Sequence, residues 1–173
     1  WIQTTSDTNW FPSASQLENK IKSIKGKNLI LFINSPNNPS GTVCKNLEEI
    51  TEVAKKHRLI ILSDEIYSQL TFDNQYKSIS NFYQEGTIVS TGLSKWCGAG
   101  GWRLGYFLIP EALRELRDSL TILASETFSS VSAPIQYAAI AAYNNNHNEY
   151  INDSRSILKA VGEYVYENLK SNT

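Results

Sequence analysis

The sequence predicts an α/β domain, built as a three-layer sandwich around a mainly parallel sheet. Short apolar runs of strand length alternate with amphipathic helical segments through the first hundred residues, and polar loops separate them. The chain has 173 residues, which is enough for one domain with a substantial core. In sheets of this class, ligands bind beyond the carboxyl ends of the strands.

Four apolar runs are expected to form the strands. The run at 28–33 is long enough for a strand that is buried on both faces. Further strands are expected at 59–62, 87–89 and 106–109. The segment 34–41 is expected to be a loop, because its two prolines and its glycine interrupt regular structure.

Five segments carry apolar residues at helical spacing. A short helix is expected over 17–24, and Asn46 is expected to cap a second helix that ends near His57. Three later helices are expected over 111–124, 133–143 and 148–170. The last helix is expected to bury one apolar stripe, formed by Ile151, Ile157, Leu158, Val161, Val165 and Leu169.

Composition and charge argue against several classes of partner. Lys and Arg number 16 and Asp and Glu number 17, so the net charge of -1 gives no electrostatic case for nucleic acid or a membrane. No apolar run reaches the roughly 18 residues that a membrane span needs. Cys44 and Cys97 have neither metal-ligand spacing nor a plausible disulfide framework. We therefore expect no metal site and a reducing, cytoplasmic location.

The most informative residue is Lys95, which lies among small residues with Arg103 eight positions later. Such a lysine is expected to be buried, and burial lowers the pKa of an amine because a low dielectric disfavours the ammonium ion. The neutral amine can form a Schiff base with an aldehyde such as pyridoxal phosphate. The planar guanidinium of Arg103 suits a phosphate group.

Three motifs follow successive strands. They are Asn-Ser-Pro-Asn-Asn-Pro-Ser-Gly at 34–41, Ser-Asp-Glu-Ile-Tyr at 63–67 and Gly-Leu-Ser-Lys-Trp-Cys-Gly-Ala-Gly-Gly-Trp-Arg-Leu-Gly at 92–105. In this order they resemble the motifs of fold-type I pyridoxal-phosphate enzymes, specifically the class I/II aminotransferases. The resemblance covers roughly residues 29–143, and it implies the fold of the family's cofactor-binding large domain.

The resemblance also implies a role for each of five residues. Lys95 would hold pyridoxal 5'-phosphate as a Schiff base and then move protons at the substrate's alpha carbon. Asp64 would face the pyridine nitrogen and keep it protonated. Tyr67 and Asn38 would bind the phenolic oxygen of the cofactor, and Arg103 would bind its phosphate.

Some neighbouring residues remain as alternatives or departures. Asn37 precedes Asn38, but the Asn-Pro-Ser-Gly spacing selects Asn38. Glu65 follows Asp64, so a shift of one residue in register would exchange the roles of these two carboxylates. Many family members carry a phosphate-binding serine where this chain has Gly92. The hydroxyl groups that could replace it belong to Ser90, Thr91 and Ser94.

The function that the resemblance implies is an aminotransferase, moving an amino group between an amino acid and a 2-oxo acid through Lys95. Two alternatives share the same motifs. One is another enzyme of this fold, such as a carbon–sulfur lyase or a cyclopropane-forming synthase. The other is a non-catalytic, aminotransferase-like sensor domain of a transcription regulator.

The resemblance further implies a homodimer and a division of the chain. Residues 1–147 are expected to be part of the large domain, and residues 148–173 to begin the helix that leads to a small domain. The family's large domain is expected to begin before Trp1, and its small domain to follow Thr173. The segment alone is therefore expected to be inactive.

Overall fold

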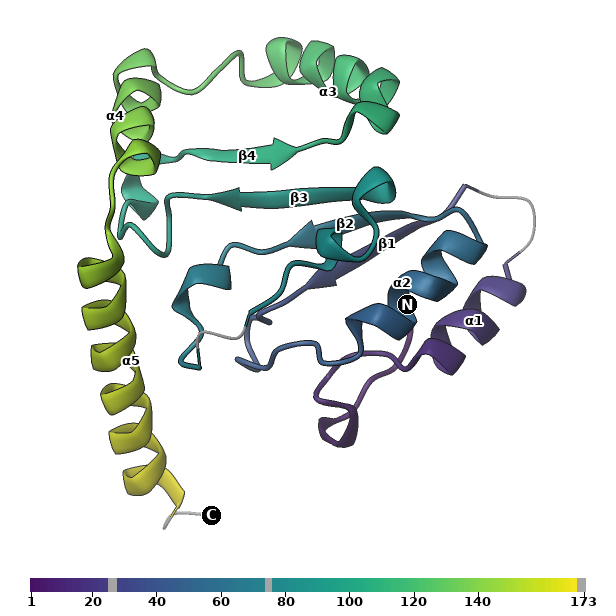
Figure 1. Ribbon diagram of the computed structural model, residues 1–173, viewed down its shortest axis with the longest axis horizontal. Coiled ribbons are helices and arrows are strands. Elements are labelled where there is room, and N and C mark those ends of the chain that lie inside the picture. The colour runs from purple at the N-terminus through teal and green to yellow at the C-terminus, as the bar shows by residue number, and fades with distance from the viewer. Residues whose placement is uncertain (25–27, 74–75, 171–173) are drawn as a thin grey trace.

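Within the residues that it describes, this computed structural model has one sheet of four strands (Figure 1). The structure describes residues 1–24, 28–73 and 76–170. The strands are β1 (Ile30–Asn34), β2 (Ile60–Asp64), β3 (Thr87–Gly92) and β4 (Gly105–Leu108). They lie in the order β1-β2-β3-β4, with β1, β2 and β3 parallel and β4 antiparallel to β3. The α/β class with a mainly parallel sheet is confirmed.

All five expected helices are present. They are α1 (Ala14–Lys22), α2 (Leu47–Lys56), α3 (Arg114–Thr127), α4 (Ala133–Asn144) and α5 (Asn148–Leu169). Short 3-10 helices lie in the connections, at Ser6–Thr8 (η1), Ser68–Leu70 (η2), Ile79–Asn81 (η3), Gln84–Gly86 (η4), Gly100–Trp102 (η5) and Glu111–Leu113 (η6).

The start of α1 and the capping of α2 differ from expectation. Helix α1 begins three residues early, because Ser13 and Gln16 each bond the other's backbone N–H in a capping box. Asn46 does precede α2, but its side chain makes no capping bond. Its amide instead donates to the carbonyl of Pro12 at 3.0 Å, so this side chain connects the start of α2 to the N-terminal segment.

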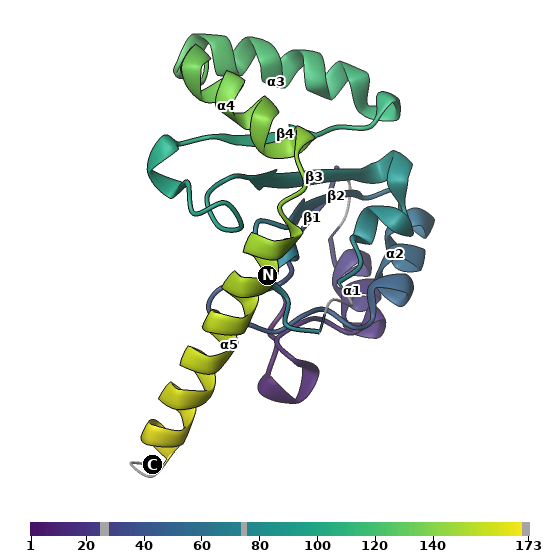
Figure 2. The same ribbon diagram turned by 60° about the vertical axis from the view of Figure 1, so that its left-hand side comes forward.

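One face of the sheet is covered by α1 and α2 (Figures 1 and 2). The hydrophobic core lies between this face and the two helices. Ile50 and Ile61 are fully buried there, and Ile33 packs with them. Successive side chains of a strand point to opposite faces, and on the other face of β1 Ile30 and Phe32 are 63% and 61% exposed. The expectation that β1 is buried on both faces is wrong for the described chain, because α1 and α2 cover only one of them.

Helix α5 contacts the rest of the described chain mainly near its start and then extends away from the sheet (Figures 1 and 2). Ile151 is buried, and Arg155 Nε donates to the Gln69 carbonyl at 2.7 Å. The expected buried stripe is wrong beyond Ile151, since the later members are exposed: Ile157, Leu158, Val161, Val165 and Leu169. The domain division after residue 147 stays a prediction. None of the described helices is both long and apolar enough to span a membrane.

A cluster of charges around Glu18 joins α1 to α2. The Glu18 carboxylate lies 3.1 Å from Lys22 Nζ, 2.9 Å from Lys56 Nζ and 2.8 Å from His57 Nε2. Hydrogen bonds from Lys56, His57 and Lys22 lower the pKa of Glu18 from 4.5 to about 2. The ionised carboxylate therefore stabilises the packing of the two helices.

Replacing Glu18 by Gln should lower the urea midpoint of unfolding at pH 7. Because the folded-state pKa lies below the unfolded value, the stabilisation is present above about pH 4.5 and is lost as the pH falls toward 2. The midpoints of the two proteins, measured from pH 7 downward, should converge in acid. Glu52→Gln, which removes one exposed pair with Lys55, is the control and should change the midpoint less. Equal midpoints at pH 7 would contradict the prediction.

Candidate active site

The carboxyl ends of the three parallel strands lie at one edge of the sheet. Asn34 pairs with Asp64 across β1 and β2, and Asp64 pairs with Ser90 across β2 and β3. The loops that leave these ends carry Asn38, Tyr67 and Lys95. The parallel pairing thus brings together residues that are up to 57 positions apart in the sequence.

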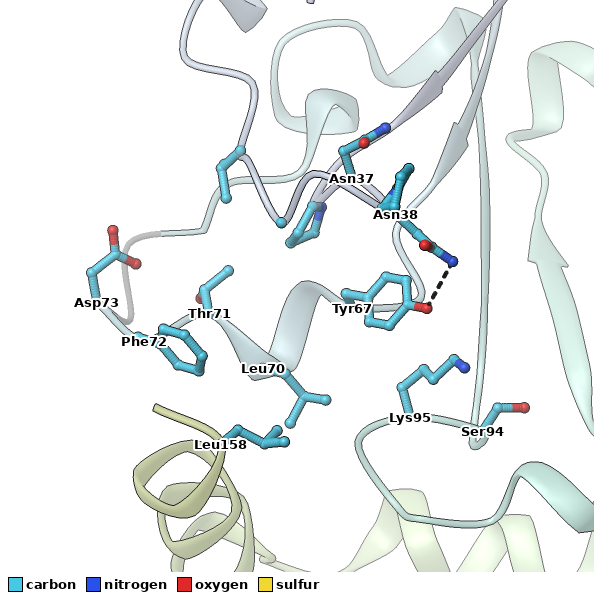
Figure 3. Close-up of a pocket in the computed structure, with 14 residues that line it drawn as sticks. Asn37, Asn38, Tyr67, Leu70, Thr71, Phe72, Asp73, Ser94, Lys95 and Leu158 are labelled. Carbon is cyan, nitrogen blue, oxygen red and sulfur yellow. Dashed lines mark hydrogen bonds between the residues drawn. The ribbon is translucent and has the colours of Figure 1, made fainter. Parts of the chain in front are cut away.

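Asn38, Tyr67 and Lys95 line one pocket of about 760 Å³ (Figure 3). The Asn38 amide Nδ2 donates to the Tyr67 hydroxyl at 3.4 Å. Lys95 Nζ lies 5.4 Å from the centre of the Tyr67 ring. An amine, a phenol and an amide therefore meet in one concave site.

The loop that carries Lys95 is held by its neighbours in the sequence. Leu93, Trp96 and Leu104 are buried in a cluster with residues of α4 and α5. The Trp96 ring lies 5.6 Å from that of Tyr143, centre to centre. Lys95 itself is exposed, so the expectation of a buried lysine is wrong for the described chain. With its neighbours packed inward, the lysine side chain faces the pocket.

Two adjacent carboxylates at the end of β2 have different surroundings. Asp64 is half-buried, and its Oδ1 accepts the Ile66 N–H at 3.2 Å. Glu65 is 5% exposed and accepts hydrogen bonds from the hydroxyls of Ser63 at 3.0 Å and Ser78 at 2.7 Å. Glu65 is thus held inside the fold by hydrogen bonds from these two serines. Asp64 lies at the strand end, although it does not line the pocket itself.

Arg103 is exposed and lies outside the pocket lining. Its backbone is left-handed, with φ of 56°, and its Nη1 donates to the Gly100 carbonyl at 2.7 Å. The structure therefore brings Asn38, Tyr67 and Lys95 together, whereas Asp64 and Arg103 lie outside the pocket lining.

Gly92 stands where the resemblance in the motifs implies a phosphate-binding serine in many family members. A Cβ atom built on Gly92 would lie 2.5 Å from the Leu104 carbonyl oxygen and 2.9 Å from Gly105 Cα. Both contacts are with backbone atoms at the start of β4, where pairing with β3 leaves the backbone little freedom to shift. Of the three nearby hydroxyl residues, Ser94 is the one that lines the pocket.

The pocket also has an apolar side that sequence analysis did not assign. Leu70, Phe72 and Leu158 lie there, opposite Lys95 (Figure 3). In the sequence, Leu158 is recognisable only as one member of the apolar stripe of α5. The spacing of such a stripe does not indicate which of its residues lines a pocket. Within the described residues, no group of three or more His, Cys, Asp or Glu side chains is placed to hold a metal ion.

Comparison with known proteins gives the family. A model of the family described as aminotransferase class I and II matches residues 2–172. The chain belongs to this family. The resemblance in the three motifs is thereby confirmed.

Individual relatives of the class I and II aminotransferase segment support the same placement. It is 34% identical to an aspartate aminotransferase of a Bacillus species, over 99% of this chain and 43% of the relative. It is 34% identical to an asparagine–oxo-acid transaminase of Streptococcus mutans, over 84% of this chain and 37% of the relative. The solved alanine aminotransferase of Pyrococcus furiosus superimposes with a TM-score of 0.84 at 32% identity, covering 98% of this chain and 44% of that one. The chain thus spans about two fifths of the length of the relatives it matches.

Replacing Gly92 by Ala should destabilise the protein by about 1–3 kcal/mol, because the added methyl group meets backbone that has no space for it. Urea unfolding monitored by circular dichroism measures the change. Gly101→Ala in the same loop is the matched control, since a Cβ there meets no atom within 4 Å. A Gly92→Ala protein as stable as the Gly101→Ala protein would contradict the geometry.

Proposed function

We propose that the protein is a pyridoxal-phosphate-dependent aminotransferase that moves an amino group between an amino acid and a 2-oxo acid. The observation that carries the proposal is the meeting of Lys95, Tyr67 and Asn38 in one pocket, in a chain of the class I and II family. A pocket with an exposed amine and two polar groups beside it suits an aldehyde cofactor that also bears a ring oxygen.

The residues present fit this cofactor. Lys95 supplies an amine that an aldehyde can reach, and the Asn38–Tyr67 hydrogen bond shows that both polar groups face the same point. Ser94 and Arg103 are the candidates for the phosphate. When bound, the cofactor supplies an electron sink for negative charge at the substrate's alpha carbon.

Each of the other roles follows from the chemistry of the side chain. The Lys95 amine would attach the cofactor and later carry a proton to and from the alpha carbon. Tyr67 and Asn38 would donate to the cofactor's ring oxygen and withdraw negative charge from it. Asp64 would hold a proton on the ring nitrogen, for which a carboxylate at the end of β2 is suited. The glutamate beside it is less suited, because Ser63 and Ser78 already occupy its oxygen.

The substrate class remains broad in this proposal. The relatives named above are an aspartate aminotransferase, an asparagine–oxo-acid transaminase and an alanine aminotransferase, so membership of the family does not select one amino acid. We propose an amino acid and a 2-oxo acid as the two substrates.

We also propose that the protein works as a homodimer in the cytoplasm. Large apolar side chains of α3 and α4 are exposed in the described chain, and apolar surface of this extent is typical of association. They are Ile122, Leu123, Tyr137 and Ile140. Both cysteines are free thiols, as suits a reducing compartment.

Replacing Lys95 by Ala in the full-length protein should lower the rate of transamination by at least about 10²–10⁴-fold, because the proton carrier is lost. Borohydride reduction followed by peptide mass spectrometry should add the mass of the cofactor less one oxygen atom to the Lys95 peptide of the wild type only, because water leaves on attachment and two hydrogens are added on reduction. Lys159→Ala on α5 is the control for losing an exposed lysine and should keep both properties. A Lys95→Ala protein with near-normal turnover would exclude the proposed role.

Replacing Tyr67 by Phe should raise the pH at which the absorbance of the bound cofactor changes. Once the cofactor is attached, a proton on the Lys95 nitrogen can bond to the cofactor's ring oxygen. Without the Tyr67 donor this oxygen would keep more negative charge, and the pKa of the nitrogen would rise. Loss of one such hydrogen bond is worth about 1.4 kcal/mol, or roughly one pH unit. A spectrophotometric pH titration measures the midpoint, and Tyr164→Phe on the exposed part of α5 should leave it unchanged. A downward shift in Tyr67→Phe would contradict the assignment.

A further inference from the structure

Asn34, the last residue of β1, ties two parts of the candidate site together through its side chain. It is half-buried and does not line the pocket. Its Nδ2 donates to the backbone carbonyl of Asp64 at 3.2 Å. Its Oδ1 accepts the backbone N–H of Asn38 at 2.8 Å. A side-chain amide offers both a donor and an acceptor, and here the donor bonds the end of β2 while the acceptor bonds the loop after β1.

Both bonding partners belong to residues of the proposed active site. Asp64 ends β2, and Asn38 is the residue whose amide reaches the Tyr67 hydroxyl. The backbone N–H of Asn38 thus has its acceptor on β1, which is part of the rigid sheet. The Asn34 amide therefore bonds the backbone of Asn38 to the end of β1.

The rest of the loop closes mostly on itself. Asn37 N–H donates to the Thr42 carbonyl at 2.8 Å, and Gly41 N–H donates to the Asn37 carbonyl at 2.8 Å. These bonds shape the turn but do not connect Asn38 to the neighbouring strand. The Ser35 N–H also donates to the Asp64 carbonyl, at 3.1 Å, so β1 and β2 stay joined at this level without Asn34. Loss of the Asn34 amide should thus release Asn38 more than it disturbs the sheet.

We propose that Asn34 is a positioning residue that fixes Asn38 relative to Asp64, and through Asn38 sets the proton affinity at Lys95. The inference rests on the proposed function. Polar groups that act on a cofactor must be held to within about half an ångström, which a supporting hydrogen bond on a rigid strand provides. A displacement of about 1 Å can cost on the order of 10²-fold in rate.

The test is a spectrophotometric pH titration of the cofactor-loaded full-length protein, carried out on the wild type, four variants of Asn34 and Asn38, and one control variant. Asn34→Ala should raise the midpoint of the absorbance change, in the same direction as Asn38→Ala and by less. The double variant should match Asn38→Ala alone, because Asn34 acts through Asn38. The turnover number of Asn34→Ala should fall by about 10-fold to 100-fold. Asn34→Ser, whose short hydroxyl cannot reach both the Asp64 carbonyl and the Asn38 N–H, should also raise the midpoint, and it carries the test if the alanine variant fails to fold.

A matched control separates positioning from plain structural support. The Asn46 side chain is also half-buried and also donates to a backbone carbonyl, that of Pro12, but it lies outside the pocket. Asn46→Ala should lower the melting temperature and leave the midpoint unchanged. If Asn34→Ala and Asn34→Ser lower stability with the wild-type midpoint, Asn34 is structural only and the inference is overturned. A wild-type protein that binds no cofactor at Lys95 would overturn the proposed function, and this inference with it.

Discussion

The parallel register of β1, β2 and β3 is the constraint on which the site depends. Because Asn34, Asp64 and Ser90 lie side by side, the three strands end at one level and their loops leave from one edge. Each loop can then be short and still deliver one functional side chain to the same pocket. A strand of the opposite direction in this position would send its carboxyl end to the far edge. Antiparallel β4 does run that way, and it serves instead to return the chain after the lysine loop.

Packing on the far side of the lysine loop supplies the second part of the arrangement. Trp96 is 4% exposed and Leu93 is 1% exposed, and both belong to a cluster with Ala139 of α4 and Ile151 of α5. A residue between two such anchors has little freedom to turn inward. The exposed position of Lys95 thus follows from the burial of its neighbours. The same cluster joins the loop to the first turn of α5, so the direction of that helix and the position of the lysine depend on one set of contacts.

The sequence predicts the strands and helices well because each strand is a short apolar run and each helix carries apolar residues at helical spacing, and the loop motifs mark the strand ends. What it does not predict is set by contacts between distant residues. The side chain of Asn46 follows every rule for a helix cap, yet the carbonyl of Pro12, 34 positions earlier, takes its amide. The run at 28–33 is apolar throughout, but nothing local tells which face α1 and α2 will cover. Asn34 shows no signal at all in the sequence beyond its place at the start of a motif, because one of its partners ends β2 and the other lies in the loop after β1.

The close approach at Gly92 shows how the lysine loop and β4 constrain each other. The backbone of Leu104 and Gly105 lies so near Gly92 that a side chain there has no space, and a hydroxyl group on this residue is excluded by the same contact. A donor for an anionic group must therefore come from another position of the loop. Ser94 meets this condition because it lies beyond the paired part of β3, next to Lys95, and lines the pocket. Ser90 and Thr91 are within the strand and do not line it. The close contact at Gly92 thus leaves Ser94, which immediately precedes the lysine, as the hydroxyl among these three that lines the pocket.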